Sequence, residues 1–217
     1  MSFPATTTTA TSATLESTLK YLSVGSKEFD EVCALISQSH PDECVICVYS
    51  IQNPAFEERF EKFREILTNK RSKPPTQLRA FHGCSLESAQ NIASKGFQRS
   101  FNRVSAYGVG TYFSGFYNVS RQYSVSKRTQ PDAYHALIVA DVLLGKLGRQ
   151  SASGQINTEL MDASVDNPTH PKIIALPYDD AALPRYLVQF HRDAETDKVH
   201  TVQRARKITT QISSSLM

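Results

Sequence analysis

Three short motifs in the middle of the chain carry residue types that can form a ligand site. They are His82-Gly83, Tyr107-Gly-Val-Gly-Thr-Tyr112 and Ser120-Arg-Gln-Tyr123. Glycine allows a ligand to approach the backbone closely, and tyrosine rings stack on flat ligands. The Gly-Val-Gly segment lacks the third glycine of a dinucleotide fingerprint and precedes a predicted strand rather than a helix. A hydride-transferring Rossmann enzyme is therefore disfavoured. Each motif is common by itself, so their order along the chain is what makes them informative.

Regular elements are expected next to each motif. Residues Leu78 to Phe81 read as a short buried strand that ends at the His-Gly pair, and a helix is predicted from about Ser85 to Gly96. The glycine-punctuated segment turns into another strand. Residues Phe116 to Ser126 are predicted to be helical, which places Ser120 and Tyr123 on one helix face because they are three residues apart.

The flanking segments indicate the fold class. Phe56, Phe60, Phe63 and Leu67 recur at helical spacing, and Ser72-Lys-Pro-Pro ends that helix. Further strands are predicted at Tyr134–Leu144, Ile173–Leu176 and Tyr186–Phe190. Many short strands with few helices between them favour an α+β fold over a doubly wound sheet.

In this order the motifs resemble the catalytic domain of the poly(ADP-ribose) polymerase family. The matching segments are Ile51-Gln-Asn-Pro54, Phe81-His-Gly-Cys84, Gly96-Phe97, the glycine segment up to Phe113, Ser120-Arg-Gln-Tyr123, Val142-Leu-Leu-Gly145, Asp162 to Pro168, Tyr178-Asp179 and Pro184 to Phe190. The resemblance covers about 26–190. It implies a split antiparallel β-sheet with flanking helices and NAD⁺, the substrate, in a cleft.

The resemblance also implies roles for five residues. His82 would hydrogen-bond a ribose hydroxyl, and the backbone of Gly83 would hold the nicotinamide carboxamide. Ser120 would contact the same amide, Tyr123 would stack on the nicotinamide, and Tyr112 would supply a second ring. The chemistry agrees, because nicotinamide is flat and its amide needs one donor and one acceptor. Nicotinamide leaves as a neutral molecule, so its departure needs no strong general acid.

The third catalytic position of the family decides the product. Chain-forming members carry a glutamate there, whereas the alignment places Ile173 at this position. A shift of one residue gives Lys172 or Ile174, and no carboxylate occurs from Thr169 to Pro177. Isoleucine has no proton acceptor and cannot act as a general base. The resulting hypothesis is mono-ADP-ribosylation of a protein acceptor, with His82, Tyr112 and Ile173 at the catalytic positions.

Several residues depart from the family pattern or have open roles. Val109 replaces the usual lysine between the two glycines, and Cys84 stands where serine or threonine is common. Arg99 and Arg103 lie in the following loop, where they can meet the NAD⁺ pyrophosphate or serve only as surface residues.

Two alternative functions stay open at this point. One is a catalytically inactive NAD⁺-binding or partner-binding module of the same fold, since fold does not establish activity. The other is an ADP-ribosyltransferase acting on nucleic-acid ends or on a small molecule. The formal net charge of +3 gives nucleic acid no support.

Composition divides the chain into three parts. Residues 1–20 are rich in Thr, Ala and Ser and are expected to be disordered, 21–190 form the catalytic domain, and 191–217 form a polar tail. No secretory signal and no apolar run long enough to span a bilayer is visible. We therefore expect an intracellular protein, cytoplasmic or nuclear.

The cysteines give no sign of a metal centre. Cys44 and Cys47 form a CxxC pair, but no second CxxC or paired histidines complete a zinc site. They lie in a β-rich stretch, where residues three apart point to opposite faces. We therefore expect no metal, and interpret the cysteines as small hydrophobic residues.

Overall fold

The computed structural model describes residues 18–39, 41, 43–101, 106–124, 135–150 and 154–191. Residues 1–17, Arg103 and the tail beyond His191 lie outside this part, so the expectations for them stay predictions. The first strand begins at Leu19, inside the predicted disordered segment 1–20. That boundary was therefore placed too late, because the start of the sheet was not visible in the Thr-rich composition.

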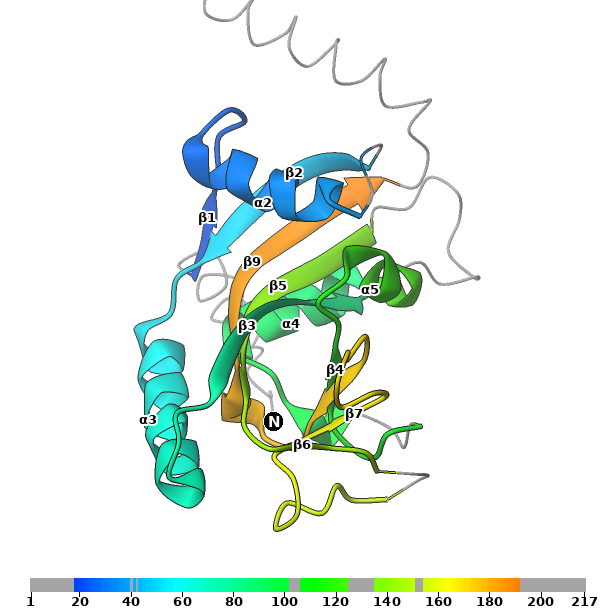
Figure 1. The fold of residues 1–217 in the computed structure, drawn as a ribbon. Helices are drawn as coiled ribbons and strands as arrows, with labels where there is room; N and C mark the ends of the chain where they lie inside the picture. Colours follow the sequence, from blue (N-terminus) through cyan, green and yellow to red (C-terminus); the bar gives the residue numbers. More distant parts are fainter. Residues whose placement is uncertain are drawn as a thin grey trace, which may run out of the picture.

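The strands form two sheets that meet at the candidate site (Figure 1). The five-stranded sheet is antiparallel and consists, in spatial order, of β1 (Leu19–Tyr21), β2 (Cys44–Ile51), β9 (Ala182–His191), β5 (His135–Leu144) and β3 (Thr76–Cys84). The four-stranded sheet consists of β4 (Thr111–Phe113), β8 (Ile174–Leu176), β7 (Ala163–Val165) and β6 (Leu147–Gly148), of which only β6 and β7 pair in parallel. An antiparallel bridge between Phe81 and Ser114 joins the sheets. The predicted α+β class with a split sheet is confirmed.

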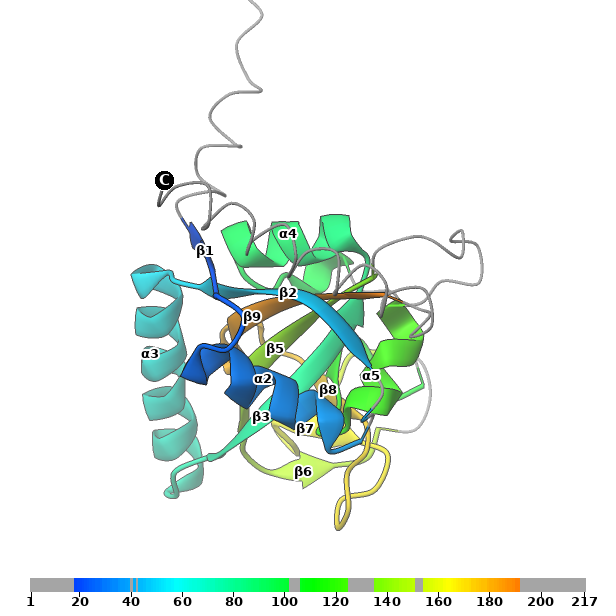
Figure 2. The same ribbon diagram turned by 90° about the horizontal axis from the view of Figure 1, so that it is seen from above.

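Helices cover both faces of the large sheet (Figure 2). The α-helices assigned to named elements are α2 (Lys27–Ser37), α3 (Pro54–Arg71), α4 (Leu86–Lys95) and α5 (Tyr117–Ser124), and η1 (Arg99–Phe101) and η2 (Asp179–Ala181) are short 3-10 turns. Strand β5 is buried along its whole length, so its side chains alternate between two cores. Leu137 and Val139 pack with α2 and α5 residues, whereas Ala136 and Ile138 pack with α4 residues.

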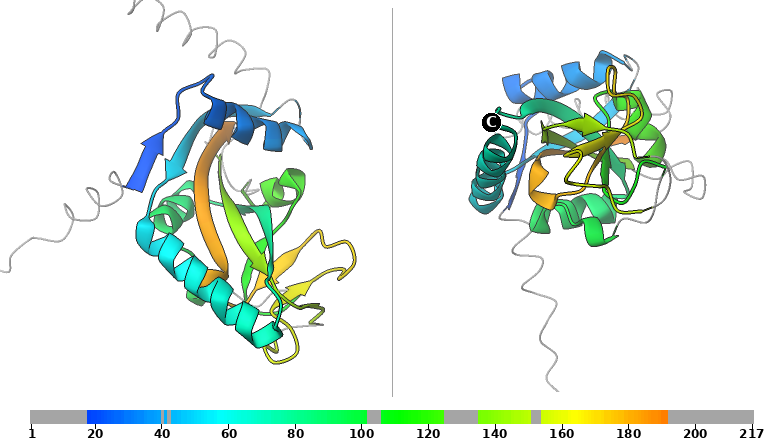
Figure 3. Two further views of the ribbon diagram at one scale, coloured as in Figure 1. Left: turned by 60° about the vertical axis from the view of Figure 1, so that its left-hand side comes forward. Right: turned by 60° about the horizontal axis from the view of Figure 1, so that its bottom comes forward.

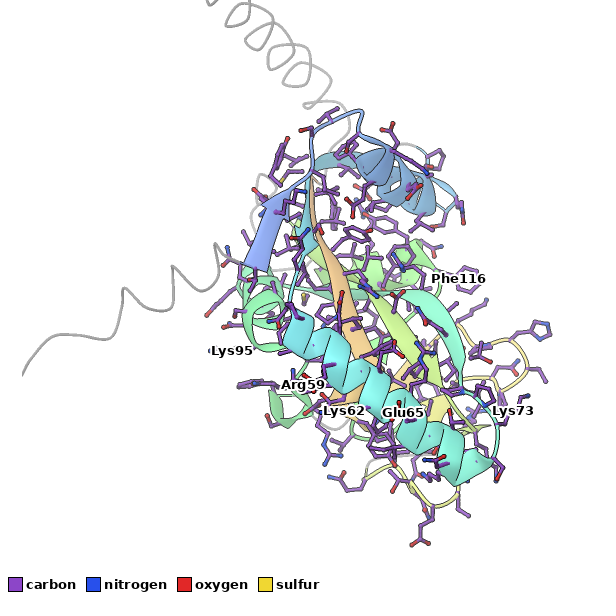
Figure 4. The ribbon with its side chains drawn as sticks, turned by 90° about the vertical axis from the view of Figure 1, so that its left-hand side faces the viewer. Arg59, Lys62, Glu65, Lys73, Lys95 and Phe116 are labelled. Carbon is purple, nitrogen blue, oxygen red and sulfur yellow. The ribbon has the colours of Figure 1, made fainter. Side chains whose placement is uncertain are left out.

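Helix α3 forms where the aromatic spacing predicted it. Asn53 caps the helix by accepting hydrogen bonds from the backbone N–H groups of Ala55 and Phe56, and proline occupies the first turn. The helix lies alongside β5 and β9 (Figure 3), and its buried residues pack on Leu143 and Leu183 of these strands. Arg59, Lys62 and Glu65 lie along the opposite, outward side (Figure 4).

Most of the predicted elements are confirmed, with shifted ends. Helix α4 is capped by Ser85 and ends before Gly96, and β3, β4, α5, β5, β8 and β9 form around the predicted positions. Helix α2 was missed, although Ser26 caps it and Phe29, Val32 and Ile36 are buried at helical spacing. Strand β2 has a bulge between Val45 and Cys47.

A buried carboxylate holds α3 against the segment that leads from β5 to β7. The side chain of Asp162 is 1% exposed and forms ion pairs with Lys70 at 2.7 Å and Arg71 at 2.8 Å. It also accepts a hydrogen bond from the backbone N–H of Lys146. Burial raises the pKa of Asp162, but these hydrogen bonds outweigh it and lower the pKa to about 2.

We expect the substitution Asp162→Asn to lower the free energy of unfolding by roughly 2–4 kcal/mol, because it removes a buried partner of two cations. Urea unfolding at pH 7 measures the change, and Asp180→Asn, which removes an exposed ion pair with Arg59, is the control. Since the folded pKa lies below the ordinary value of 3.8, the carboxylate stabilises the fold above that pH. The difference between wild type and variant should shrink as the pH falls toward 2. A difference that persists unchanged to this pH would contradict the assignment.

Candidate functional site

The ring of His82 is held between the two sheets. Its Nδ1 donates a hydrogen bond to the backbone carbonyl of Tyr112 at 2.7 Å, and its ring lies 5.5 Å from Phe97 and 5.6 Å from Phe113 between centroids. Burial lowers the pKa of His82 and outweighs the opposing effect of the Tyr112 carbonyl, so the ring is neutral at pH 7. With its proton on Nδ1, the neutral ring presents Nε2 as a hydrogen-bond acceptor.

The backbone of Gly83 lies at the outer edge of the large sheet. Strand β3 is the last strand, and the N–H and C=O of Phe81 point away from β5 to pair with Ser114 at 2.8 and 3.0 Å. Backbone groups two residues apart in a strand point the same way. The donor and acceptor of Gly83 therefore face this edge, one step beyond the pairing with Ser114.

Helix α5 packs directly on Gly83. A Cβ on that residue would collide with the backbone carbonyl of Ser120, so only glycine fits. Ser120 is 3% exposed, and its Oγ donates to the carbonyl of Phe81 at 2.8 Å. Tyr123, on the next face of the helix, is 66% exposed. The structure thus brings Ser120 to the Phe81–Gly83 edge and leaves the Tyr123 ring with a largely accessible face.

Tyr112 closes the glycine turn that precedes its own strand. Its hydroxyl donates to the carbonyl of Gly108 at 2.8 Å and accepts from the N–H of Tyr107 at 3.1 Å. Gly108 has φ +91°, a backbone conformation that favours glycine. Tyr112 therefore has two structural roles. Its hydroxyl holds the glycine turn, and its carbonyl fixes the tautomer of His82.

Ile173 immediately precedes β8 and lies on the side of that strand that faces Tyr112. Tyr112 is the register partner of Ala175, and the two pack together in one cluster, whereas Ile174 lies in the main core. Because side chains alternate, Ile173 shares the face of Ala175. Its backbone N–H donates to the carboxylate of Asp166 at 3.0 Å. No carboxylate side chain occupies the 173 position.

A cavity of about 490 Å³ opens beside His82, on the α4 face of the large sheet. This volume falls in the range of small-molecule sites. Its lining comprises His82, Cys84, Ser88, Asn91, Ile92, Lys95, Gly96, Phe97, Gln98, Phe101 and Thr111. The α4 residues were missed as site candidates, although their three-residue spacing puts Ser88 and Asn91 on one helix face.

The structure also shows the surroundings of Cys84 and Arg99. Burial raises the pKa of Cys84 to about 12, so this residue is a thiol at neutral pH and a poor nucleophile. The Arg99 guanidinium donates to the carbonyl of Pro177 at 2.7 Å, and its backbone N–H donates to Asp179 at 2.7 Å. Its predicted contact with a pyrophosphate stays a prediction.

Within the described part of the chain, no cluster of three or more His, Cys, Asp or Glu side chains is arranged to hold a metal ion. In the same residues, no helix has the length and apolar character needed to cross a membrane.

The split sheets around this cleft define the ADP-ribosyltransferase fold. Residues 26–170 match the poly(ADP-ribose) polymerase catalytic domain, and the chain belongs to this family. It is 28% identical over 187 residues to protein mono-ADP-ribosyltransferase PARP10 of Mus musculus, covering 78% of this chain and 19% of that protein. It is also 27% identical over 178 residues to protein mono-ADP-ribosyltransferase PARP14 of Homo sapiens, covering 76% of this chain and 10% of that protein. The chain thus spans a fifth or less of the length of these relatives.

We expect the substitution Gly83→Ala to abolish binding of benzamide, a nicotinamide mimic, because the new methyl group must displace α5. Gly115→Ala is the matched control, since its Cβ would meet Leu78 at an ordinary 3.8 Å. Isothermal titration with benzamide measures the effect, and circular dichroism checks the fold. Wild-type affinity in Gly83→Ala would show that the ligand does not depend on this edge.

Proposed function

We propose that this chain is an NAD⁺-dependent mono-ADP-ribosyltransferase that transfers one ADP-ribose unit to a protein acceptor and releases nicotinamide. One observation carries the proposal. Neutral His82, whose Nε2 is a hydrogen-bond acceptor, stands next to Gly83, whose backbone N–H and C=O face the outer edge of β3. The names of the two relatives support single-unit transfer.

The carboxamide of nicotinamide matches the hydrogen-bonding groups at this edge. The N–H of Gly83 donates to the amide oxygen, and its C=O accepts from the amide nitrogen. Ser120 adds a donor if its hydroxyl rotates from the carbonyl of Phe81 to the ligand. Phe81 keeps a partner in that case, because its carbonyl also accepts from the N–H of Ser114 at 3.0 Å. Tyr123 then covers the nicotinamide ring by stacking.

The remaining residues act on the ribose and on the departure of nicotinamide. Nε2 of His82 accepts a hydrogen bond from a ribose hydroxyl and so fixes the position of the sugar. The bond between the ribose C1′ and the nicotinamide nitrogen breaks, and its electron pair neutralises the pyridinium charge. The sugar passes through an oxocarbenium-like state, which also occurs in glycoside hydrolysis. An acceptor nucleophile then forms the new bond to C1′ and loses its proton.

The surroundings of Ile173 favour transfer of a single unit. Chain growth requires a base that activates a ribose hydroxyl, and isoleucine has no such group. Asp166 lies on the backbone of the same segment, where it accepts from the N–H groups of Lys172 and Ile173 at 2.9 and 3.0 Å. Burial raises the pKa of Asp166, but these hydrogen bonds prevail and lower it. A carboxylate stabilised in its charged form is a weak base and a poor replacement for the glutamate.

Labelling tests this proposal directly. Purified protein incubated with ³²P-labelled NAD⁺ should give a discrete labelled band on a denaturing gel, either on itself or on an added acceptor. His82→Ala should lose the label, because the ribose contact is removed. A ladder of long polymer would refute single-unit transfer. Label only on added RNA or DNA ends would overturn the protein acceptor, and NAD⁺ binding without any label would favour an inactive binding module.

The pH dependence of NAD⁺ binding should follow His82. Since its pKa lies below 6.5, Nε2 is an acceptor throughout the neutral range and becomes protonated only in more acidic solution. We expect the dissociation constant for NAD⁺ to be flat from about pH 7 to 8 and to rise as the pH falls through the lowered pKa. ADP-ribose, which retains the ribose hydroxyls, should behave in the same way, and benzamide should not. Tightening of NAD⁺ binding on acidification would contradict an acceptor role.

A further inference from the structure

A second buried carboxylate, Glu43, contacts the helix that carries Ser120 and Tyr123. Glu43 lies one residue before β2, and its side chain is 2% exposed. The hydroxyl of Tyr117 donates to its Oε2 at 2.7 Å, and Nε of Arg121 donates to the same oxygen. The two donors both belong to α5. The carboxylate that precedes β2 therefore binds this helix through two of its residues.

Helix α5 depends on such contacts for its position. It has eight residues, and an isolated helix of this length is not stable in water. The buried Tyr117 ring packs edge-to-face on Phe81 at 5.8 Å and on Phe190 at 5.9 Å. The guanidinium of Arg121 lies over the Phe190 ring at 5.7 Å. These contacts press α5 onto the sheet, and the hydrogen bonds to Glu43 add a directional constraint that ring packing lacks.

The spacing of the residues connects this constraint to the ligand side of the helix. Tyr117 and Arg121 are four residues apart and share one face of α5. Ser120 lies beside that face and is buried as Tyr117 is, and Tyr123 lies further round, where it is exposed. A rotation of α5 about its axis therefore moves all four residues together. Fixing the hydroxyl of Tyr117 and the guanidinium of Arg121 fixes the point on α5 from which the Tyr123 side chain extends.

The other two buried carboxylates that form ion pairs in the described residues serve different contacts. Asp141 pairs with Arg79 and Arg185 within the large sheet, and Asp162 pairs with the end of α3. Neither of these pairs includes a residue of α5. Among these three buried carboxylates, Glu43 is the one that pairs with α5.

We propose that Glu43, acting through Tyr117 and Arg121, is a positioning residue that sets the orientation of Ser120 and Tyr123 toward the nicotinamide of NAD⁺. This inference rests on the proposed function, because it assigns α5 to the nicotinamide end of the cleft. The cavity beside His82 is lined mainly by α4 and the segment that follows it. Loss of the Glu43 contacts should therefore weaken binding of the nicotinamide part of NAD⁺ more than binding of the ADP-ribose part.

The test compares two probes in a variant that keeps the ring and the Glu43–Arg121 ion pair. In Tyr117→Phe, only the hydroxyl is removed. We expect the dissociation constant for benzamide to rise about fivefold, as for loss of one net hydrogen bond. The dissociation constant for ADP-ribose, which lacks the nicotinamide, should stay within about twofold. If the Tyr117 hydroxyl had only a structural role, its removal would lower the affinity for both probes to the same extent.

The matched control is Tyr186→Phe. This substitution removes a hydrogen bond of the same kind, from the Tyr186 hydroxyl to Glu28 at 3.0 Å, which joins the sheet to α2 and not to α5. Its affinities for both probes should equal those of the wild type. Amide hydrogen exchange without ligand provides an independent measurement, and it should be faster over 117–124 in Tyr117→Phe but not in Tyr186→Phe.

The outcomes separate the two proposals. Unchanged benzamide affinity in Tyr117→Phe, or an equal loss for both probes, overturns the positioning role while the proposed function stands. Faster exchange in α5, with neither probe bound by the wild type, overturns the proposed function and with it the role of Glu43 toward nicotinamide. Glu43→Gln, which retains an oxygen acceptor but removes the charge, should reproduce the selective loss if it folds.

Discussion

The outer edge of β3 at Phe81 is the point on which the rest of the site depends. The backbone of Phe81 pairs with Ser114 and so joins the two sheets, its carbonyl accepts the hydroxyl of Ser120, and its ring packs on Tyr117. An edge strand normally exposes unpaired backbone groups, which natural proteins cover or pair. Among the described residues, the pairing of this edge stops after Phe81, and the next outward-facing backbone groups belong to Gly83. This short stretch of sheet edge is the proposed binding surface.

The alternation of a β-strand explains why two adjacent residues can serve different parts of one cleft. His82 points to the α4 face, where Phe97 and Phe113 hold its ring, whereas the missing side chain of Gly83 leaves space for α5 on the other face. The tautomer of His82 is set from the small sheet through the carbonyl of Tyr112. The two sheets must therefore be docked before the imidazole is fixed in its acceptor form.

Sequence reasoning recovered the parts of the molecule that depend on local chemistry. The phenylalanine spacing predicted α3, and the Ser85 and Gly96 signals predicted α4, because caps and periodicity are local properties. The family resemblance supplied the site candidates, and alternation along β3 and β8 explains their placement. Two features were missed for different reasons. Helix α2 carries local signals in its Ser26 cap and its buried spacing, but its end has no marked signal. The role of Glu43 depends on a distant contact, because nothing near it indicated that it would meet a helix more than seventy residues later.

The two helices on either side of His82-Gly83 are held by different kinds of interaction, and they respond differently to change. Helix α4 is anchored through buried Ala89 and Ala93, whose contacts are apolar and tolerate small displacements. Helix α5 is anchored through a buried carboxylate, whose hydrogen bonds require defined distances and angles. Geometry is therefore most strictly enforced at the helix that is proposed to face the nicotinamide. A helix that is held in position before the ligand arrives reduces the ordering cost of forming the proposed complex.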